Sequence, residues 1–514
     1  MNGAESLVKT LINHEVKVCF ANPGTSEMHF LAALDRVEGM RSVLGLHESV
    51  VTGAADGYYR VKGEPACTLL HLAPGLANGL SNLHNARKAQ SGIVNIVGQH
   101  ATYHLKYDAP LTGDIEGVAK PLSDWVKTSK DALQASADVA QAIHAAKTGA
   151  GKIATLILPA DVSWSPATEI GKKIPNKILE TVPQKQIDIV GRVLEGQGVK
   201  ALLLGGKALH GRALLLAGQI AAKTGCRIMC EGHNARVERG AGRVKLERLP
   251  YDVPSAIAVL KDIDQLILVG SKEPVGFFAY PNLPSLLAPN TCEVSKLVDA
   301  DEDVEVALES LAKNLNALST PANIAELDLP VLPKGKVTSE GIGAVLGACI
   351  PENAIVVDES ISVGRGFFPP TIGARPHDWM NSMGGSLGYA LPVSIGAAIA
   401  APDRKVLTVS GDGSAMYSLQ AMWTIARERL NVTIVILANR SYNILRSELN
   451  KVGLEKPGKT ALEMLSLDNP ELDWVALSKG HGIEATRANT LEDFAKQLQT
   501  ALDIKGPRLI ELVL

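Results

Sequence analysis

Short apolar runs alternate with helix-length segments along the whole chain. In the first third, apolar runs predict strands near residues 17–22, 41–46, 65–72, 92–99 and 154–161. The same pattern returns near residues 201–206, 227–232, 265–271, 354–360, 405–414, 432–441 and 508–514. Segments between these runs, such as 4–15 and 79–90, have the length and apolar spacing of helices. Strands that alternate with helices are typical of parallel sheets covered by helices.

Two polar, proline-containing stretches interrupt this alternation, at residues 165–184 and 317–336. They are typical of linkers. A chain of 514 residues is too long for one core, and about 150 residues per domain suggests about three domains. We therefore predict an α/β protein with three domains, each a mostly parallel sheet flanked by helices, over residues 1–165, 185–318 and 336–514.

The composition excludes several classes of protein. The chain is 46% hydrophobic and 20% charged with a net charge of −3, so it has no basic field for nucleic acid or an anionic membrane surface. No apolar window approaches the ~18 residues that a membrane span needs. The N-terminus lacks a signal-peptide pattern and the six cysteines are scattered, so we expect a cytoplasmic protein with reduced thiols.

The segment 409–441 carries the clearest chemistry. Asp412 and Asn439 lie 27 residues apart, each just after an apolar run, which is the length of one β-α-β unit. Both side chains should reach the carboxyl edge of a parallel sheet, where such sheets bind ligands. Oxygen ligands of this kind suit Mg²⁺ holding a diphosphate. The backbone of Gly411 and Gly413 and a helix starting at Ser414 would favour the phosphate groups. The alternative is that Asp412 caps a tight turn and that Asn439 is an unrelated loop residue. The 27-residue spacing makes this alternative less favourable.

This motif resembles the thiamine diphosphate motif of the superfamily that contains acetolactate synthase, pyruvate oxidase and benzoylformate decarboxylase. Further segments that resemble the superfamily are "CFANPGTSEMHFLAAL", "LHESVVTGAADGYYR", "LLHLAPGLANGLSNLHNA" and "MGGSLGYALPVSIGAAIA". The likeness covers the whole chain and is closest to acetolactate synthase large-subunit-like proteins. It implies that Asp412, Asn439 and the main-chain carbonyl of Ser441 hold Mg²⁺. Ala438 stands where the family usually has a first Asn.

The resemblance also gives a role to the carboxylate of Glu48, which precedes a helix rich in small residues. It implies that Glu48 hydrogen-bonds N1′ of the aminopyrimidine ring of the cofactor, across a subunit interface, so that the protein is a homodimer or homotetramer. An apolar site would raise the pKa of such a carboxyl. Gly53, Ala54 and Ala55 would let helices pack closely around the cofactor. His47 receives no role.

Further cofactor contacts are implied by the same resemblance. Leu387 matches the apolar wedge that holds the cofactor in its bent shape, and the main-chain carbonyl of Gly385 should bond N4′. Ser360 and Ser362 are expected at the diphosphate. The central domain shows no glycine signature for FAD, so FAD is considered unlikely.

The substrate side departs from each known member. His71 matches the proton-transferring histidine of benzoylformate decarboxylase, and Thr25 matches its carboxylate-binding serine. The second histidine of that enzyme is absent from "GSKEPVGFFAYPN", where Phe277 or Phe278 fills the place. The remaining pocket residues implied by the resemblance are Pro110, Leu111, Ile444 and Glu448, although Glu448 could equally face solvent. His104 is a polar residue of the same region without an assigned role.

The resemblance implies a Mg²⁺- and thiamine diphosphate-dependent enzyme that decarboxylates a small 2-oxo acid with carboligation, as acetolactate synthase does. Two alternatives remain open: a decarboxylase of the benzoylformate decarboxylase type, and a non-catalytic partner subunit that binds the cofactor. The second is disfavoured because a retired site has no physical reason to keep a desolvated carboxylate.

Overall fold

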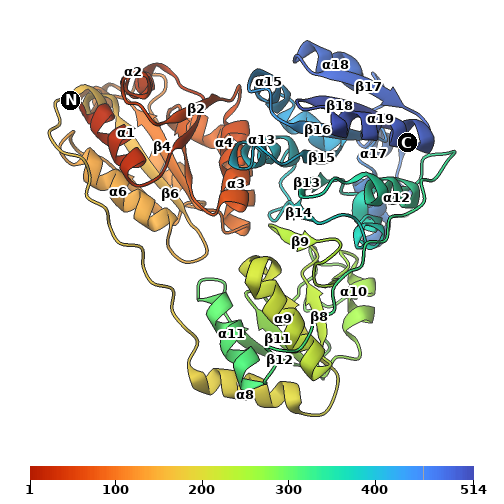
Figure 1. The fold of residues 1–514 in the computed structure, drawn as a ribbon. Helices are drawn as coiled ribbons and strands as arrows, with labels where there is room; N and C mark the ends of the chain where they lie inside the picture. The colour runs from red at the N-terminus through yellow and green to blue at the C-terminus, as the bar shows by residue number, and fades with distance from the viewer. Residues whose placement is uncertain (455) are drawn as a thin grey trace.

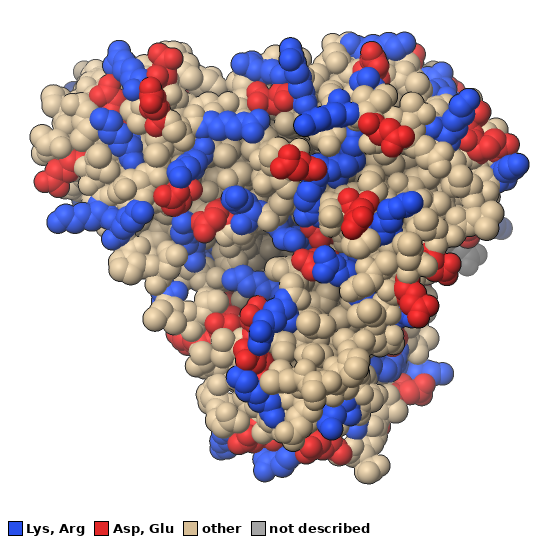
Figure 2. Space-filling model, in the orientation of Figure 1, with Lys and Arg blue, Asp and Glu red and all other residues tan. Residues whose placement is uncertain are grey.

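The computed structural model describes residues 1–454 and 456–514, which form three lobes (Figure 1). Each lobe is built on one sheet whose strands are mostly parallel, with helices packed on its faces. The predicted fold class is therefore confirmed. Basic and acidic side chains are interspersed on the face shown in Figure 2. In the described part of the chain, the helices are too short or too polar to cross a lipid bilayer.

The N-terminal sheet has six parallel strands. Their spatial order is β2 (Arg41–Leu44), β1 (Val18–Ala21), β3 (Ala66–Leu70), β4 (Ile93–Gln99), β6 (Ile153–Pro159) and β5 (Trp125–Thr128). The helices of this lobe are α1 (Gly3–Asn13), α2 (Met28–Arg36), α3 (Glu48–Lys62), α4 (Leu72–Lys88), α5 (Ile115–Ala119), α6 (Ala135–Ala146) and α7 (Ala160–Trp164). An irregular stretch leads from Ser165 to Pro183, where the sequence predicts a linker.

The central sheet has five strands in the order β10 (Glu247–Arg248), β8 (Arg227–Cys230), β7 (Lys200–Leu204), β11 (Gln265–Val269) and β12 (Glu293–Val298). Its helices are α8 (Gln184–Glu195), α9 (Gly211–Thr224), α10 (Val253–Leu260) and α11 (Val304–Asn314). One segment of this stretch of chain belongs elsewhere: β9 (Val237–Arg239) pairs antiparallel with a strand of the third sheet.

The C-terminal sheet has seven strands in the order β17 (Glu484–Ala488), β18 (Arg508–Val513), β16 (Val432–Ala438), β15 (Val406–Gly411), β13 (Ala354–Glu359), β14 (His377–Asn381) and β9. Its helices are α12 (Ser339–Cys349), α13 (Ala390–Ala400), α14 (Asp412–Ala415), α15 (Ala421–Arg427), α16 (Asn443–Lys451), α17 (Lys459–Glu463), α18 (Trp474–Gly480) and α19 (Leu491–Asp503). The central strands β13, β15 and β16 lie side by side and parallel, so their carboxyl ends share one edge.

Helices α3 and α13 join the first and third lobes. A Cβ built on Gly57 would lie 2.1 Å from the carbonyl oxygen of Val393, and one built on Gly396 would lie 1.9 Å from that of Ala54. Such close backbone approach is possible only where a side chain is missing. The small residues that follow Glu48 therefore serve contact with α13 of the third lobe.

Candidate active site

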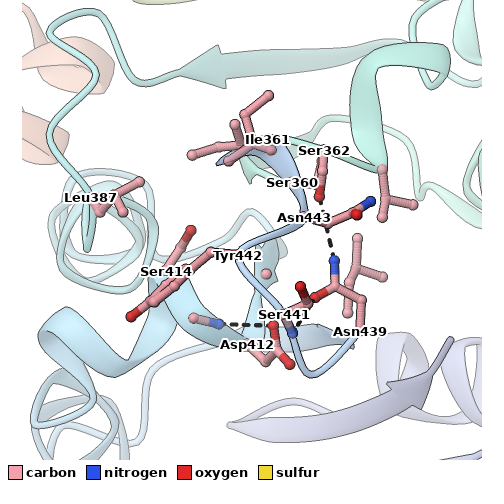
Figure 3. A pocket seen from close by; sticks show the side chains of 15 residues that line it. Ser360, Ile361, Ser362, Leu387, Asp412, Ser414, Asn439, Ser441, Tyr442 and Asn443 are labelled. Atoms are coloured by element: carbon pink, nitrogen blue, oxygen red, sulfur yellow. Dashed lines mark hydrogen bonds between the residues drawn. The ribbon is translucent and has the colours of Figure 1, made fainter. Parts of the chain in front are cut away.

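The predicted metal and diphosphate residues meet at the carboxyl edge of β13, β15 and β16 (Figure 3). Asp412 follows β15 directly, Asn439 follows β16, and Ser360 and Ser362 follow β13. They line one cavity together with Leu387, Gly411, Gly413, Ser414, Ser441 and Ile444. The helix at this edge begins at Asp412, two residues before the expected start at Ser414.

Backbone amides orient the polar groups of this cavity. The N–H of Arg440 donates to Asp412 Oδ2 at 2.6 Å, and the N–H of Gly413 donates to Oδ1 at 2.8 Å. The amide of Asn439 donates to the Ser362 hydroxyl at 3.4 Å, and its Oδ1 accepts from the N–H of Ser441 at 3.0 Å. Burial raises the pKa of Asp412, which the amide hydrogen bonds oppose.

This donor set fits a hard divalent cation. Asp412 is 3% exposed and, within residues 1–454 and 456–514, forms no ion pair with a basic side chain. Among the described residues its carboxylate is therefore compensated by backbone N–H groups and by the more distant charge of Arg440, which leaves part of the cost of burying an anion unmet. A carboxylate, the Asn439 amide oxygen and the Ser441 carbonyl are oxygen ligands of the kind that Mg²⁺ prefers.

The loop before α13 carries Gly385 and Leu387 beside this cavity. Gly385 and Gly388 adopt φ values of +73° and +83°, a region that glycine occupies without strain. Asn85 of α4 holds the loop: its Oδ1 accepts from the N–H of Ser386 at 3.1 Å and its amide donates to the Ser386 carbonyl at 2.9 Å. The expected wedge and the expected N4′ acceptor are thus fixed by the N-terminal lobe.

Leu387 also lines a second cavity of about 300 Å³. Phe277, Phe278, Ile444 and Glu448, four of the residues expected in a substrate pocket, line it. Glu448 does not face solvent freely, because the Tyr280 hydroxyl donates to its Oε2 at 2.5 Å and Lys451 Nζ lies 3.1 Å from its Oε1. Sequence reasoning missed the other part of the wall, which comprises His233, Arg248, Tyr251 and Arg365.

The central domain does place a histidine, His233, in this cavity, although the segment expected to supply one contains none. The segment 271–282 lacks a histidine, yet the loop after β8 brings His233 into the same cavity, with its ring 5.7 Å from that of Phe277. Burial lowers the pKa of His233 to about 4, and Arg248 and Arg365 act in the same direction. The imidazole is therefore neutral near pH 7. Nothing in the local pattern "CEGHNA" distinguished it.

The N-terminal lobe holds a separate group of predicted residues. His71 caps α4 after β3, and its Nδ1 lies 2.8 Å from Oε2 of Glu27, which also accepts from the N–H of Gly24 at 2.7 Å. Glu27 is 2% exposed, and burial raises its pKa while the His71 bond opposes that shift. The sequence reasoning overlooked Glu27, although it stands two residues after Thr25 in a segment that carries the resemblance.

The remaining residues of this group lie nearby in the same lobe. Glu48 is the first residue of α3 and 7% exposed, and Asn78 of α4 donates to its Oε2 at 3.0 Å. His47, which had no role, caps α3: its Nδ1 accepts from the N–H of Ser49 at 3.2 Å. Thr25, Pro110 and Leu111 are exposed, and the neighbouring Gly113 approaches Ala73 at the start of α4.

One chain does not bring the two groups together. Among the residues that the structure describes, those lining the two cavities beside Leu387 do not include Thr25, Glu48, His71, Pro110 or Leu111. The side chains that could activate a cofactor and those that could hold its diphosphate thus occupy different lobes.

Models of two protein families match the chain: the thiamine pyrophosphate enzyme N-terminal TPP binding domain over residues 1–141 and the C-terminal TPP binding domain over residues 371–512. The chain therefore belongs to the thiamine pyrophosphate-dependent enzymes. Among relatives, it is 47% identical to IlvX of Mycobacterium tuberculosis, provisionally named an acetolactate synthase large subunit, over 100% of this chain and 99% of that one. It is 29% identical to benzoylformate decarboxylase of Pseudomonas aeruginosa, over 98% and 97% of the two chains.

A solved structure agrees with this assignment. The thiamine diphosphate-dependent 4-hydroxybenzoylformate decarboxylase of Rhodococcus jostii superposes with a TM-score of 0.85 at 25% identity, covering 99% of this chain and 98% of that one. Benzoylformate decarboxylase of Polynucleobacter necessarius, at 20% identity and a TM-score of 0.80 over 100% and 99% of the chains, shares the fold.

Proposed function

We propose that this enzyme uses thiamine diphosphate and Mg²⁺ to decarboxylate a 2-oxo acid and then delivers a proton or a second carbonyl compound to the product. The observation that carries the proposal is the His71–Glu27 pair at 2.8 Å, in the same lobe as the buried Glu48. Thiamine diphosphate, when bound, supplies the ring that accepts the electrons released with CO₂.

The residues of the C-terminal lobe would bind and orient. Asp412, Asn439 and the Ser441 carbonyl would hold Mg²⁺, while Ser360, Ser362 and the Ser414 amide would receive the diphosphate. In D412N, which removes the charge and keeps the shape, we expect the Mg²⁺ concentration needed for half-maximal cofactor binding to rise about tenfold or more. Calorimetric titration of cofactor at several Mg²⁺ concentrations measures this directly, without turnover.

The residues of the N-terminal lobe would move protons. If Nδ1 of His71 donates to Glu27, its Nε2 is the nitrogen left to exchange a proton with a reacting group. Glu48, buried and oriented by Asn78, would hydrogen-bond a ring nitrogen of the cofactor. A histidine held in this way favours protonation of the product, and therefore simple decarboxylation.

Acetolactate-type carboligation is the second candidate. It is supported by the 47% identity, over the whole chain, to a protein provisionally named an acetolactate synthase large subunit. Both reactions begin with the loss of CO₂ and differ in the fate of the remaining carbanion. Supplying pyruvate, 2-oxobutyrate and benzoylformate with cofactor and Mg²⁺, then measuring CO₂ and identifying the products, separates them. Aldehyde supports decarboxylation, and a 2-hydroxy ketone or acetohydroxy acid supports carboligation. Cofactor binding without turnover on any 2-oxo acid would favour the non-catalytic partner subunit.

A homodimer or homotetramer is part of the proposal. Large apolar side chains are exposed around the N-terminal group, among them Leu46 at 45%, Tyr103 at 62% and Tyr107 at 66%. Clusters of this kind mark interaction surfaces, and a second copy would bring the C-terminal cavities opposite Glu48 and His71. Light scattering of the purified protein tests this, and a monomer that is fully active would contradict it.

The proposal does not include bound FAD. A cleft of about 1170 Å³ lies between the N-terminal and central lobes, at the carboxyl ends of β7 and β11. It is lined by charged side chains of both signs, including Lys177, Glu231, Lys272 and Asp301. The absorption spectrum of the purified protein tests the prediction, since a bound flavin would colour it yellow.

A further inference from the structure

The cavity of about 300 Å³ has a cationic wall that the proposed reaction does not use. Phe277 lies against Gly385, because a Cβ built on Gly385 would be 2.6 Å from Phe277 Cζ. The Tyr251 ring follows at 5.4 Å from Phe277, and the Arg365 guanidinium lies 4.1 Å from the centre of the Tyr251 ring. The Phe277 and Tyr251 rings thus lie between the Arg365 guanidinium and the Gly385 loop, which is expected to contact the cofactor.

Arg248 and Arg365 of this wall each use one N–H group in a hydrogen bond to the described residues. Arg248 donates through Nε to the Gly232 carbonyl at 2.8 Å, and Arg365 through Nε to the Ile361 carbonyl at 3.2 Å. Over residues 1–454 and 456–514, their terminal nitrogens make no further hydrogen bond and neither side chain forms an ion pair. The positive charges of both arginines lower the pKa of His233. The His233 ring likewise has no hydrogen bond to a described residue.

A third cation lies behind Arg248. Arg239 is 3% exposed, and its Nε and Nη1 have no partner among the described residues. Burial and the nearby Arg248 lower the pKa of Arg239 to about 9. Arg239 is buried and Arg248 half-buried, whereas Arg365 is exposed. Like charges gathered in this way repel one another unless an anion compensates them.

The carboxylates that line the same cavity are already engaged. Glu448 binds the Tyr280 hydroxyl and Lys451. Asp358 accepts from Trp379 Nε1 at 3.1 Å and from the Asn381 amide at 3.2 Å, while Glu359 accepts from the N–H groups of Tyr389 and Ala390. The charge of Arg248 and Arg365 is therefore open to a ligand, and a guanidinium matches a carboxylate in shape as well as in charge.

We propose that Arg248 and Arg365, with a hydrogen bond from His233, bind a second anionic group of the substrate, remote from its keto carbon. This inference rests on the proposed function and names its substrate class: 2-oxo dicarboxylic acids. The diphosphate of the cofactor is a poorer occupant, because the cavity around Asp412 and Asn439 is not lined by either arginine.

The experiment compares two substrates of equal chain length, 2-oxoglutarate and 2-oxovalerate, which differ in a terminal carboxylate. CO₂ release from each is measured with the holoenzyme of wild type, R365A, R248A and R365K, with R192A as the control on the exposed face of α8. We expect wild type to favour 2-oxoglutarate in kcat/KM. R365A and R248A should each lower kcat/KM for 2-oxoglutarate about tenfold or more and change that for 2-oxovalerate less than about twofold. R365K should recover part of the loss, and R192A should behave as wild type.

The other outcomes are each decisive. Equal losses for both substrates would mean that the wall binds the carboxylate next to the keto group, and a weaker cofactor affinity in R365A would mean that it binds the diphosphate; either overturns the inference. Turnover of 2-oxovalerate alone would overturn it and leave the proposed function standing. If neither substrate releases CO₂, calorimetric titration of glutarate against butyrate still decides: tighter glutarate binding that R365A abolishes supports the wall, and equal binding overturns it, while the proposed function fails separately.

Discussion

Nδ1 of His71 lies 2.8 Å from Oε2 of Glu27, joining the end of β3 to the turn that follows β1. The pair is enclosed on the other side by Gly98 of β4, where a Cβ would overlap Glu27 Oε1 at 1.6 Å. A buried carboxylate beside a histidine fixes which ring nitrogen carries the proton. The pair therefore determines how His71 can act.

Replacing this carboxylate by its amide tests the pair. E27Q keeps the volume and removes the charge that orients His71, so we expect kcat for decarboxylation to fall about 100-fold with little change in KM. The pH dependence of kcat should also change, which a merely structural effect would not produce. Steady-state kinetics of E27Q measure both, with the exposed Glu38→Gln as control. An unaltered kcat would remove Glu27 from the proposal.

Glu48 should act on the cofactor and contribute little to its affinity. We expect E48Q to bind thiamine diphosphate within about threefold of wild type, but to exchange the C2 proton of the cofactor about 100-fold more slowly. Exchange is followed by NMR after transfer into D₂O, and binding by calorimetry. Unchanged exchange in E48Q would show that this carboxylate does not activate the cofactor.

The contact between α3 and α13 should tolerate no added methyl group. A Cβ at Gly396 would lie 1.9 Å from the Ala54 carbonyl oxygen, so G396A must push two helices apart. We expect the free energy of unfolding to fall by about 3 kcal/mol. Urea denaturation measures it, with G480A as the matched control because nothing lies within 4 Å of that position. Equal stability of the two variants would contradict the packing described.

Stability should depend on pH through Glu359. Burial raises the pKa of this carboxyl to about 7 from its ordinary 4.5, so the folded state holds a proton that the unfolded state releases. Stability from this group is present below about pH 4.5 and is lost as pH rises to about 7, a change of about 3 kcal/mol. E359Q removes this titration. We therefore expect the free energy of unfolding of the wild type, relative to that of E359Q, to fall between pH 5 and pH 8. Denaturation curves at both pH values measure it; a parallel response would contradict it.

The local sequence pattern was sufficient to predict site residues that directly follow a strand. Asp412 and Asn439 could be placed together because β15 and β16 are continuous apolar runs joined by one crossover, and parallel neighbours end at the same edge. Strands that contain several polar residues were missed: β17 is largely exposed, and β14 is buried but contains His377, Asp378 and Asn381. Their polar residues hide the apolar alternation on which such predictions depend.

The sequence by itself determined the alternation of strands and helices, the three sheets, and the residues at the carboxyl edge of the C-terminal sheet, because each depends on neighbours along the chain. Only the tertiary structure decided that Glu27 meets His71, that His233 and two arginines line one cavity with Gly385, and that the small residues of α3 contact α13. These contacts join segments 44 to more than 300 residues apart. They depend on how three separately formed sheets pack, which no local pattern encodes.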